Sequence, residues 1–133
     1  MGYTHYLRQI SDGAAEKHPN FNKVMDALER VAIHEKDGIE SSKYYEGPHE
    51  YEGGKHYIRD EFGISFTGFD TFVFPEHTDF MFCKTQCEPF DTAVVACYHI
   101  IETLMGDLYK FSSDGEEKYL AEGRALGNSI LNN

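Results

Sequence analysis

Hydrophobic residues recur at helical spacing in three segments of the chain. In residues 21–32 the apolar side chains fall three or four positions apart, as on a helix that buries one face, and Asn20 can cap its start. Residues 89–105 are apolar around most of the helical circumference, which predicts the most buried helix. Residues 119–131 repeat the spacing of the first segment, and Ser113-Asp114-Gly115-Glu116 before them has the form of a capping box. We therefore expect three helices.

Shorter runs between these segments predict strands. Residues 3–7 form a plausible first strand, and residues 108–111 form a plausible last one. Three runs in the middle of the chain, 62–66, 71–74 and 80–83, each contain two Phe residues and predict an antiparallel meander with one face buried by Phe. The combined pattern predicts an α+β fold, in which about three helices pack on a mostly antiparallel sheet.

Residues 39–56 have no sustained periodicity and predict either a long loop that is both aromatic and polar or a loose hairpin. Tyrosine is enriched at protein interfaces because its ring buries a large area at a low entropic cost. The tyrosines in and next to this segment are therefore candidate interface residues for a protein partner: Tyr44, Tyr45, Tyr51 and Tyr57.

Length and composition limit the class of protein. The 133 residues match one domain of the usual size, about 100–200 residues, so we interpret 1–133 as a single α+β domain. An apolar share of 41% and an aromatic share of 14% exclude a disordered chain. The longest apolar run, residues 93–98, is too short to cross a membrane, and the N-terminus lacks the basic start and apolar core of a signal peptide. A cytoplasmic location is expected.

Charge indicates which partners to expect. Acidic residues number 23 and basic residues 12, giving a net charge of −11. This excess argues against direct binding to nucleic acid, because the phosphate backbone would be repelled. It favours partners with basic surfaces, since long-range attraction steers association.

Motifs for known chemistries are missing from the sequence. There is no phosphate-binding glycine loop, no dinucleotide fingerprint and no Gly-x-Ser-x-Gly elbow. The three cysteines, Cys83, Cys87 and Cys97, lack the spacing of a zinc site and are expected to be free thiols. The seven histidines include no His-Glu-x-x-His pair. We predict no metal, no cofactor and no catalytic residue, and a hydrolase remains only a third alternative.

Two polar segments combine small polar groups with the start of an expected helix. They are residues 82–91 and 111–115. Free backbone amides at a helix start attract anions, although the same residues can equally be helix caps and nothing more. With the N-terminal histidine, these segments supply the candidate ligand-binding residues: His5, Lys84, Thr85, Asp91, Ser112, Ser113 and Asp114.

Three sequence blocks resemble a family of small phage and prophage proteins. The blocks are Met1-Gly2-Tyr3-Thr4-His5-Tyr6, then Phe82-Cys83-Lys84-Thr85 with Pro89-Phe90-Asp91, and finally Ser112-Ser113-Asp114-Gly115. They recur in this order in the family and cover about half of the chain. The resemblance implies a phage context and the host cytoplasm, but no established activity.

Together these observations predict a small acidic accessory protein that binds a host or phage protein without catalysis. The alternative is a small-anion or nucleotide-binding protein with a site near Lys84, Thr85 and 112–114. Gly123 and Gly127 permit close approach of another backbone to the last helix. That helix either packs within the monomer or forms a homodimer.

Overall fold

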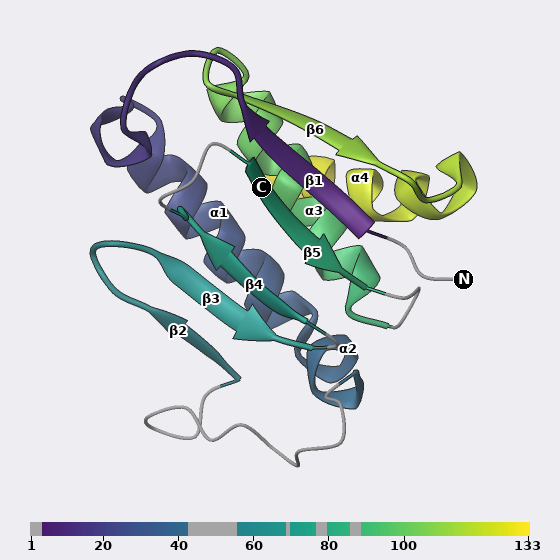
Figure 1. Ribbon diagram of the computed structural model, residues 1–133. Coiled ribbons are helices and arrows are strands. Elements are labelled where there is room, and N and C mark those ends of the chain that lie inside the picture. The colour runs from purple at the N-terminus through teal and green to yellow at the C-terminus, as the bar shows by residue number, and fades with distance from the viewer. Residues whose placement is uncertain (1–3, 43–55, 69, 77–79, 86–88) are drawn as a thin grey trace.

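Strands form one layer of the molecule, and the helices lie behind them in a second layer, as a computed structural model shows (Figure 1). The structure describes residues 4–42, 56–68, 70–76, 80–85 and 89–133. The strands in these ranges are β1 (Thr4–Gln9), β2 (Tyr57–Arg59), β3 (Ile64–Thr67), β4 (Thr71–Phe74), β5 (Phe80–Lys84) and β6 (Tyr109–Ser113). The helices are the short η1 (Ala15–Lys17), α1 (Phe21–His34), α2 (Lys36–Ser41), α3 (Asp91–Met105) and α4 (Glu117–Leu131). The predicted α+β fold is confirmed.

The described strands form two antiparallel sheets. In the first, which we call the β1 sheet, β1 lies between β5 and β6; in the second, the β3 sheet, β3 lies between β2 and β4. The predicted meander is wrong in one pairing, because β5 pairs with β1 and not with β4. A strand's hydrophobic pattern sets which face is buried, but it does not set which strand lies beside it. Pairing with β1 places Met81 opposite Leu7, and both side chains are fully buried.

Helix α3 is the most buried of the described helices, as predicted. Ten of its 15 residues are buried. The ring of Tyr98 packs against Phe72 of β4 at 5.5 Å between centroids, and edge-on against Phe111 of β6 at 5.8 Å. A single side chain of α3 therefore contacts both sheets.

Helix α4 packs on α3 within the monomer, through the two glycines that the sequence analysis identified. A Cβ atom added at Gly123 would lie 2.5 Å from Val95 Cβ, and one at Gly127 would lie 2.9 Å from His99 Cδ2. Real Cβ atoms do not approach this closely, so these glycines allow the two helices to touch. The monomer therefore provides a packing partner for the apolar stripe of α4.

Replacing Gly123 with alanine is expected to destabilise the protein by about 1–3 kcal/mol, because the added methyl group overpacks the α3–α4 contact. Helix propensity alone would change stability by about 1 kcal/mol in the opposite direction. Urea unfolding of the variant and the wild type measures the net effect. A more stable variant would show that α4 is not held against Val95.

Two local predictions are corrected by the structure. Ser113 belongs to β6 and does not cap α4, which starts at Glu117 after an N-cap residue, Glu116, without a side-chain cap. The expected loop 39–56 begins later than predicted, because residues 39–41 belong to α2, where Ile39 is buried. No helix in the described part of the chain has both the length and the apolarity needed to span a membrane.

Candidate functional site

Four of the predicted ligand-binding residues form one hydrogen-bonded group, which we call the His5 network. It consists of His5, Thr85, Asp91 and Ser113. The His5 ring is fully buried; its Nδ1 lies 2.7 Å from Ser113 Oγ, and its Nε2 lies 2.5 Å from Asp91 Oδ1. The hydroxyl of Thr85 donates to the same oxygen of Asp91. Residues far apart in the sequence therefore meet where the β1 sheet reaches the start of α3.

Each hydrogen-bond donor of the His5 network has an acceptor within the chain. The backbone N–H of Gly115 donates to Ser113 Oγ at 2.9 Å. With the ring proton on Nε2, the Ser113 hydroxyl donates to Nδ1 of His5, and Nε2 donates to Asp91. Among the described residues, no buried side-chain nitrogen or oxygen lacks a hydrogen-bond partner. The network is complete without a ligand.

The order serine, histidine, aspartate is also that of a hydrolase triad, but the environment differs. A catalytic base must be reached by the group whose proton it takes. The ring of His5 is 0% exposed, and it contacts Ser113 through Nδ1 and Asp91 through Nε2, the reverse of the arrangement in the serine-protease triad. We therefore assign the His5 network a structural role: it joins β1, β6 and the start of α3.

The helix starts offer little to an external anion. Asp91 is the first residue of α3, so its own carboxylate already supplies the negative charge that a helix N-terminus attracts. Glu116 and Glu117 stand at the start of α4. Asp114 accepts a hydrogen bond from the backbone N–H of Thr4 at 2.7 Å, so it too acts within the chain.

Lys84 and Ser112 lie apart from the His5 network, on the opposite face of the β1 sheet. Side chains alternate between the two faces of a strand, and both residues are exposed while their neighbours Cys83 and Phe111 point into the core. The described helices lie on the inner face (Figure 1). Of the seven predicted residues, four form the His5 network, Lys84 and Ser112 lie on this open face, and Asp114 bonds the backbone of Thr4.

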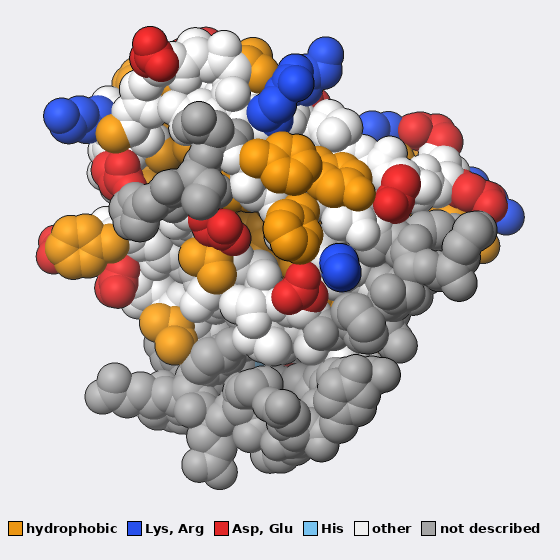
Figure 2. All heavy atoms as spheres, in the orientation of Figure 1, with side chains coloured by type: hydrophobic (Ala, Val, Ile, Leu, Met, Phe, Trp, Pro, Cys, Tyr) orange, Lys and Arg blue, Asp and Glu red, His pale blue; other side chains and the backbone are white. Residues whose placement is uncertain are grey.

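The outer face of the β1 sheet consists of the outward side chains of its three strands. They are Thr4, Tyr6, Arg8, Phe80, Phe82, Lys84, Lys110 and Ser112. Figure 2 shows a cluster of hydrophobic side chains on this side of the molecule, bordered by Lys and Arg side chains and also by Asp and Glu side chains. Three of the eight are cations and none is an acid.

Aromatic rings make up the centre of this outer face. Tyr6 stacks on Phe80 with 5.4 Å between ring centroids, and Phe80 lies 6.5 Å from Phe82. Phe80 and Phe82 are 49% and 47% exposed, which corrects the prediction that the Phe residues of this run lie on the buried face. Met81 and Cys83 are the inward residues of β5.

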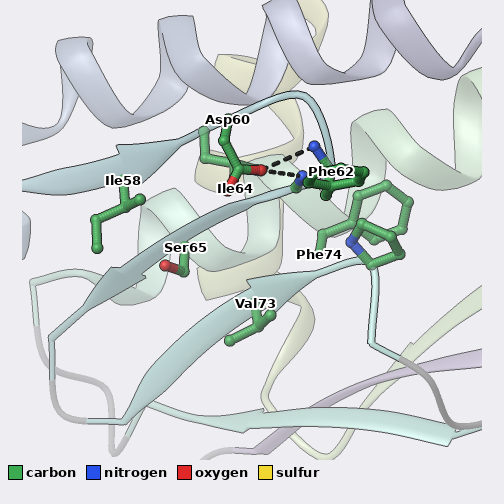
Figure 3. A pocket seen from close by; sticks show the side chains of 9 residues that line it. Ile58, Asp60, Phe62, Ile64, Ser65, Val73 and Phe74 are labelled. Carbon is green, nitrogen blue, oxygen red and sulfur yellow. Dashed lines mark hydrogen bonds between the residues drawn. The ribbon is translucent and has the colours of Figure 1, made fainter. Parts of the chain in front are cut away.

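An open pocket lies on the outer face of the other sheet. It has a volume of about 230 Å³, and its floor is the row Ile58, Ser65 and Val73, which crosses β2, β3 and β4 (Figure 3). We call it the β3-sheet pocket. Phe62 and Pro75 also line it, and Phe62 is 69% exposed although the sequence pattern predicts it in a strand with a buried face.

One of the four candidate interface tyrosines lies in the described part of the chain. Tyr44, Tyr45 and Tyr51 lie outside the described residues. Tyr57 is buried, and its hydroxyl donates to Glu29 at 2.8 Å; burial and this carboxylate raise its pKa. The structure therefore places Tyr57 in the packing between β2 and α1 and not on an accessible surface.

The described cysteines are unsuited to nucleophilic chemistry. Cys83 and Cys97 are free thiols, as predicted, and both are buried. Burial raises the pKa of each thiol well above its usual value, so neither forms the thiolate that reacts or binds metal. Within the described ranges, no group of three or more His, Cys, Asp or Glu side chains is arranged to hold a metal ion.

The surface residues that stand out in the structure were missed at the sequence level. Tyr6, Phe62 and Phe82 were assigned to strands without a surface role, and Arg8 lies just beyond the first predicted strand. A signal existed for one of them: Phe80 and Phe82 flank Met81 and precede Cys83, so a period of two allows either pair to face inward. Only the pairing with β1 decides between them.

Comparison with known proteins gives no match, whether to a protein-family model, a curated protein or a solved structure. The function is therefore argued from the residues themselves.

Proposed function

We propose that the protein is a non-catalytic binding protein, whose partner is a basic protein that inserts a hydrophobic side chain into the β3-sheet pocket. The observation that carries this proposal is the exposure of Phe62, at 69% the most exposed large hydrophobic residue among those described. Ile58, at 44%, is the second exposed hydrophobic residue of the pocket. Exposed apolar groups beside a pocket mark interaction sites more often than isolated ones do.

The fold does not need an aromatic residue at position 62. The turn between β2 and β3 is held by Asp60, whose carboxylate accepts hydrogen bonds from the backbone N–H groups of Phe62 and Gly63 at 2.8 and 3.0 Å (Figure 3). These bonds use the backbone of residue 62 and not its ring. The ring is therefore available to contact a partner.

The size of the pocket favours a side chain over a free small molecule. Its volume of about 230 Å³ is below the range of about 300–1,000 Å³ that is usual for small-molecule sites. Buried anchor side chains in shallow pockets are the common centre of protein interfaces. A single aliphatic or aromatic side chain of a partner matches this site.

Charge near the pocket favours a basic partner. Asp60 lines the pocket, and the exposed Glu61 follows it. Arg59, the nearest cation along the chain, is paired with Asp26 at 2.8 Å and with Glu29 at 2.7 Å. The net charge of −11 adds long-range attraction for basic surfaces. The resemblance to phage proteins suggests a host or phage protein as the source of this partner.

Replacing Phe62 with serine is expected to reduce retention of the partner by about tenfold or more, because an interface anchor is lost. The measurement is affinity purification of the tagged chain from host cell lysate, with retained proteins quantified by mass spectrometry. Ile33→Ser is the matched control, since Ile33 is 57% exposed but lies on α1 in the helix layer.

The proposal predicts one basic protein that the wild type and Ile33→Ser retain equally and that Phe62→Ser does not. Equal retention by both variants, or no retained protein at low and moderate salt, would contradict it. Both substitutions are at the surface and should change unfolding free energy by no more than about 0.5 kcal/mol, which thermal unfolding checks.

A further inference from the structure

The outer face of the β1 sheet carries an ordered array of aromatic and cationic side chains. Strand pairing sets them in rows: Arg8 lies between Phe80 and Lys110, and in the next row Tyr6 lies between Phe82 and Ser112. Lys84 lies beside Thr4 in the row after that. The aromatic rings are therefore flanked by cations at both ends of the sheet face: Arg8 and Lys110 at one end and Lys84 at the other.

We propose that this face binds single-stranded nucleic acid, with bases stacked on the rings and phosphates held by the cations. Aromatic side chains on an open sheet face stack on unpaired bases, and neighbouring cations follow the backbone. The rings of Phe80 and Phe82 are about half exposed, and Tyr6 stacks on Phe80. A paired duplex hides the faces of its bases and does not fit this chemistry.

The charge of this face is opposite to that of the whole chain. Its eight outward positions include Arg8, Lys84 and Lys110, whereas the chain has a net charge of −11. Two carboxylates border the face: Asp70 accepts a hydrogen bond from the backbone N–H of Lys84 at 3.1 Å, and Asp114 accepts one from that of Thr4 at 2.7 Å. The sequence-level expectation that the protein does not bind nucleic acid used the total charge only. The acidic remainder of the surface repels phosphates and so restricts a strand to this one face.

The spacing of the cations favours a strand over a mononucleotide. Lys84 is four residues along β5 from Phe80, which pairs with Arg8, so Lys84 and Arg8 lie about 13 Å apart along the strand direction. A single phosphate would contact both only if the two side chains extended toward each other across the intervening row. A chain of a few nucleotides can contact both and can cover the rings between them.

The test is fluorescence anisotropy of a labelled oligothymidylate of about 15 nucleotides, a length near the usual site size for such surfaces. We expect saturable binding that weakens with salt. Three phosphate contacts predict a slope of log K against log salt of about −2, since each contact on a single strand contributes about −0.7. A labelled duplex of the same length should bind at least about tenfold more weakly, because its bases cannot stack on the rings.

Variants distinguish binding at this face from the long-range effect of the protein's total charge. Lys84→Glu and Phe82→Ser are each expected to weaken binding by about tenfold or more. Lys23→Glu changes the net charge by the same amount as Lys84→Glu, but at an exposed position of α1. It should change the affinity by less than about twofold, and Phe62→Ser should do the same. Thermal unfolding confirms that each variant is folded.

Several outcomes overturn the proposal. They are an absence of oligothymidylate binding at low salt, equal affinity for the duplex, and equal losses for Lys84→Glu and Lys23→Glu. A further arm uses labelled poly-L-glutamate. If that polymer binds with the same dependence on Lys84 and Phe82 while oligothymidylate does not, the face binds acidic peptides and the nucleic-acid proposal is wrong. Because Phe62 lies on the other sheet, these results are independent of the proposed protein partner.

Discussion

Replacing Asp91 with alanine is expected to destabilise the protein by about 2–5 kcal/mol. Its carboxylate accepts hydrogen bonds from both His5 Nε2 and the Thr85 hydroxyl, and both of these groups are buried. Each buried polar group left without a partner costs about 1–3 kcal/mol. The substitution also removes a negative charge from the first turn of α3, which adds about 0.3–1 kcal/mol. Urea unfolding gives the free energy directly.

Two variants serve as controls for this result. Asp91→Asn retains an acceptor oxygen for His5 and Thr85, so we expect less than half of the alanine effect. Asp114→Ala removes an exposed carboxylate that bonds only the backbone N–H of Thr4 among the described contacts, and should cost about 0.5–1.5 kcal/mol. If Asp91→Ala costs no more than Asp114→Ala, the His5 network does not join the β1 sheet to α3.

Replacing Tyr98 with alanine is expected to destabilise the protein by about 3–5 kcal/mol, as large-to-small changes of buried aromatics do. Tyr98 is 1% exposed and its ring contacts Phe72 of one sheet and Phe111 of the other. The cavity therefore opens between two sheets and a helix, where the surrounding elements cannot collapse together easily. The measurement is again the unfolding free energy in urea.

The control for Tyr98 is Ile33→Ala, which truncates an exposed side chain of α1 and should change stability by no more than about 0.5 kcal/mol. A cost for Tyr98→Ala below about 1 kcal/mol would mean that α3 does not hold the two sheets together. Loss of cooperative unfolding, seen as separate transitions by different probes, would support that role because the sheets would then unfold separately.

Helix positions were predictable from the sequence because a one-sided apolar stripe repeats over many residues. Segments 21–32, 89–105 and 119–131 correspond to α1, α3 and α4. Sheet topology was not predictable in the same way. The run 80–83 is a strand as expected, but its partner is β1, which lies more than 70 residues away in the chain. The hydrophobic pattern of a short segment does not indicate which distant strand it pairs with.

The sequence predicted some members of the candidate site but not their burial or the face of the sheet on which each lies. Small polar residues next to helix starts identified Asp91 and Ser113, and the structure brings both to His5. Their bonding to His5, and not to a ligand, depends on burial that the sequence does not reveal. Lys84 and Ser112 were grouped with them because they are adjacent in the chain, yet neighbours along a strand face opposite sides of the sheet.

Exposure of aromatic residues was the main feature hidden from sequence reasoning. A phenylalanine in a strand is most simply a core residue, and Phe66, Phe72 and Phe74 are fully buried. Phe62 and Phe82 have the same residue type and similar neighbours but face outward. Only the tertiary structure shows that the helices cover one side of the sheet layer and leave the described part of the other side open (Figure 1).

The most direct test of the account is photo-crosslinking from the open side of the sheet layer. A benzophenone amino acid is placed at position 62 in one variant and at position 33 in another, and both variants are irradiated in the cells that express them. The account predicts a discrete crosslinked product with one basic protein from position 62 and none from position 33 on the helix layer. The same product from both positions, or no product from position 62, would contradict the claim that the β3-sheet pocket is the protein-binding surface.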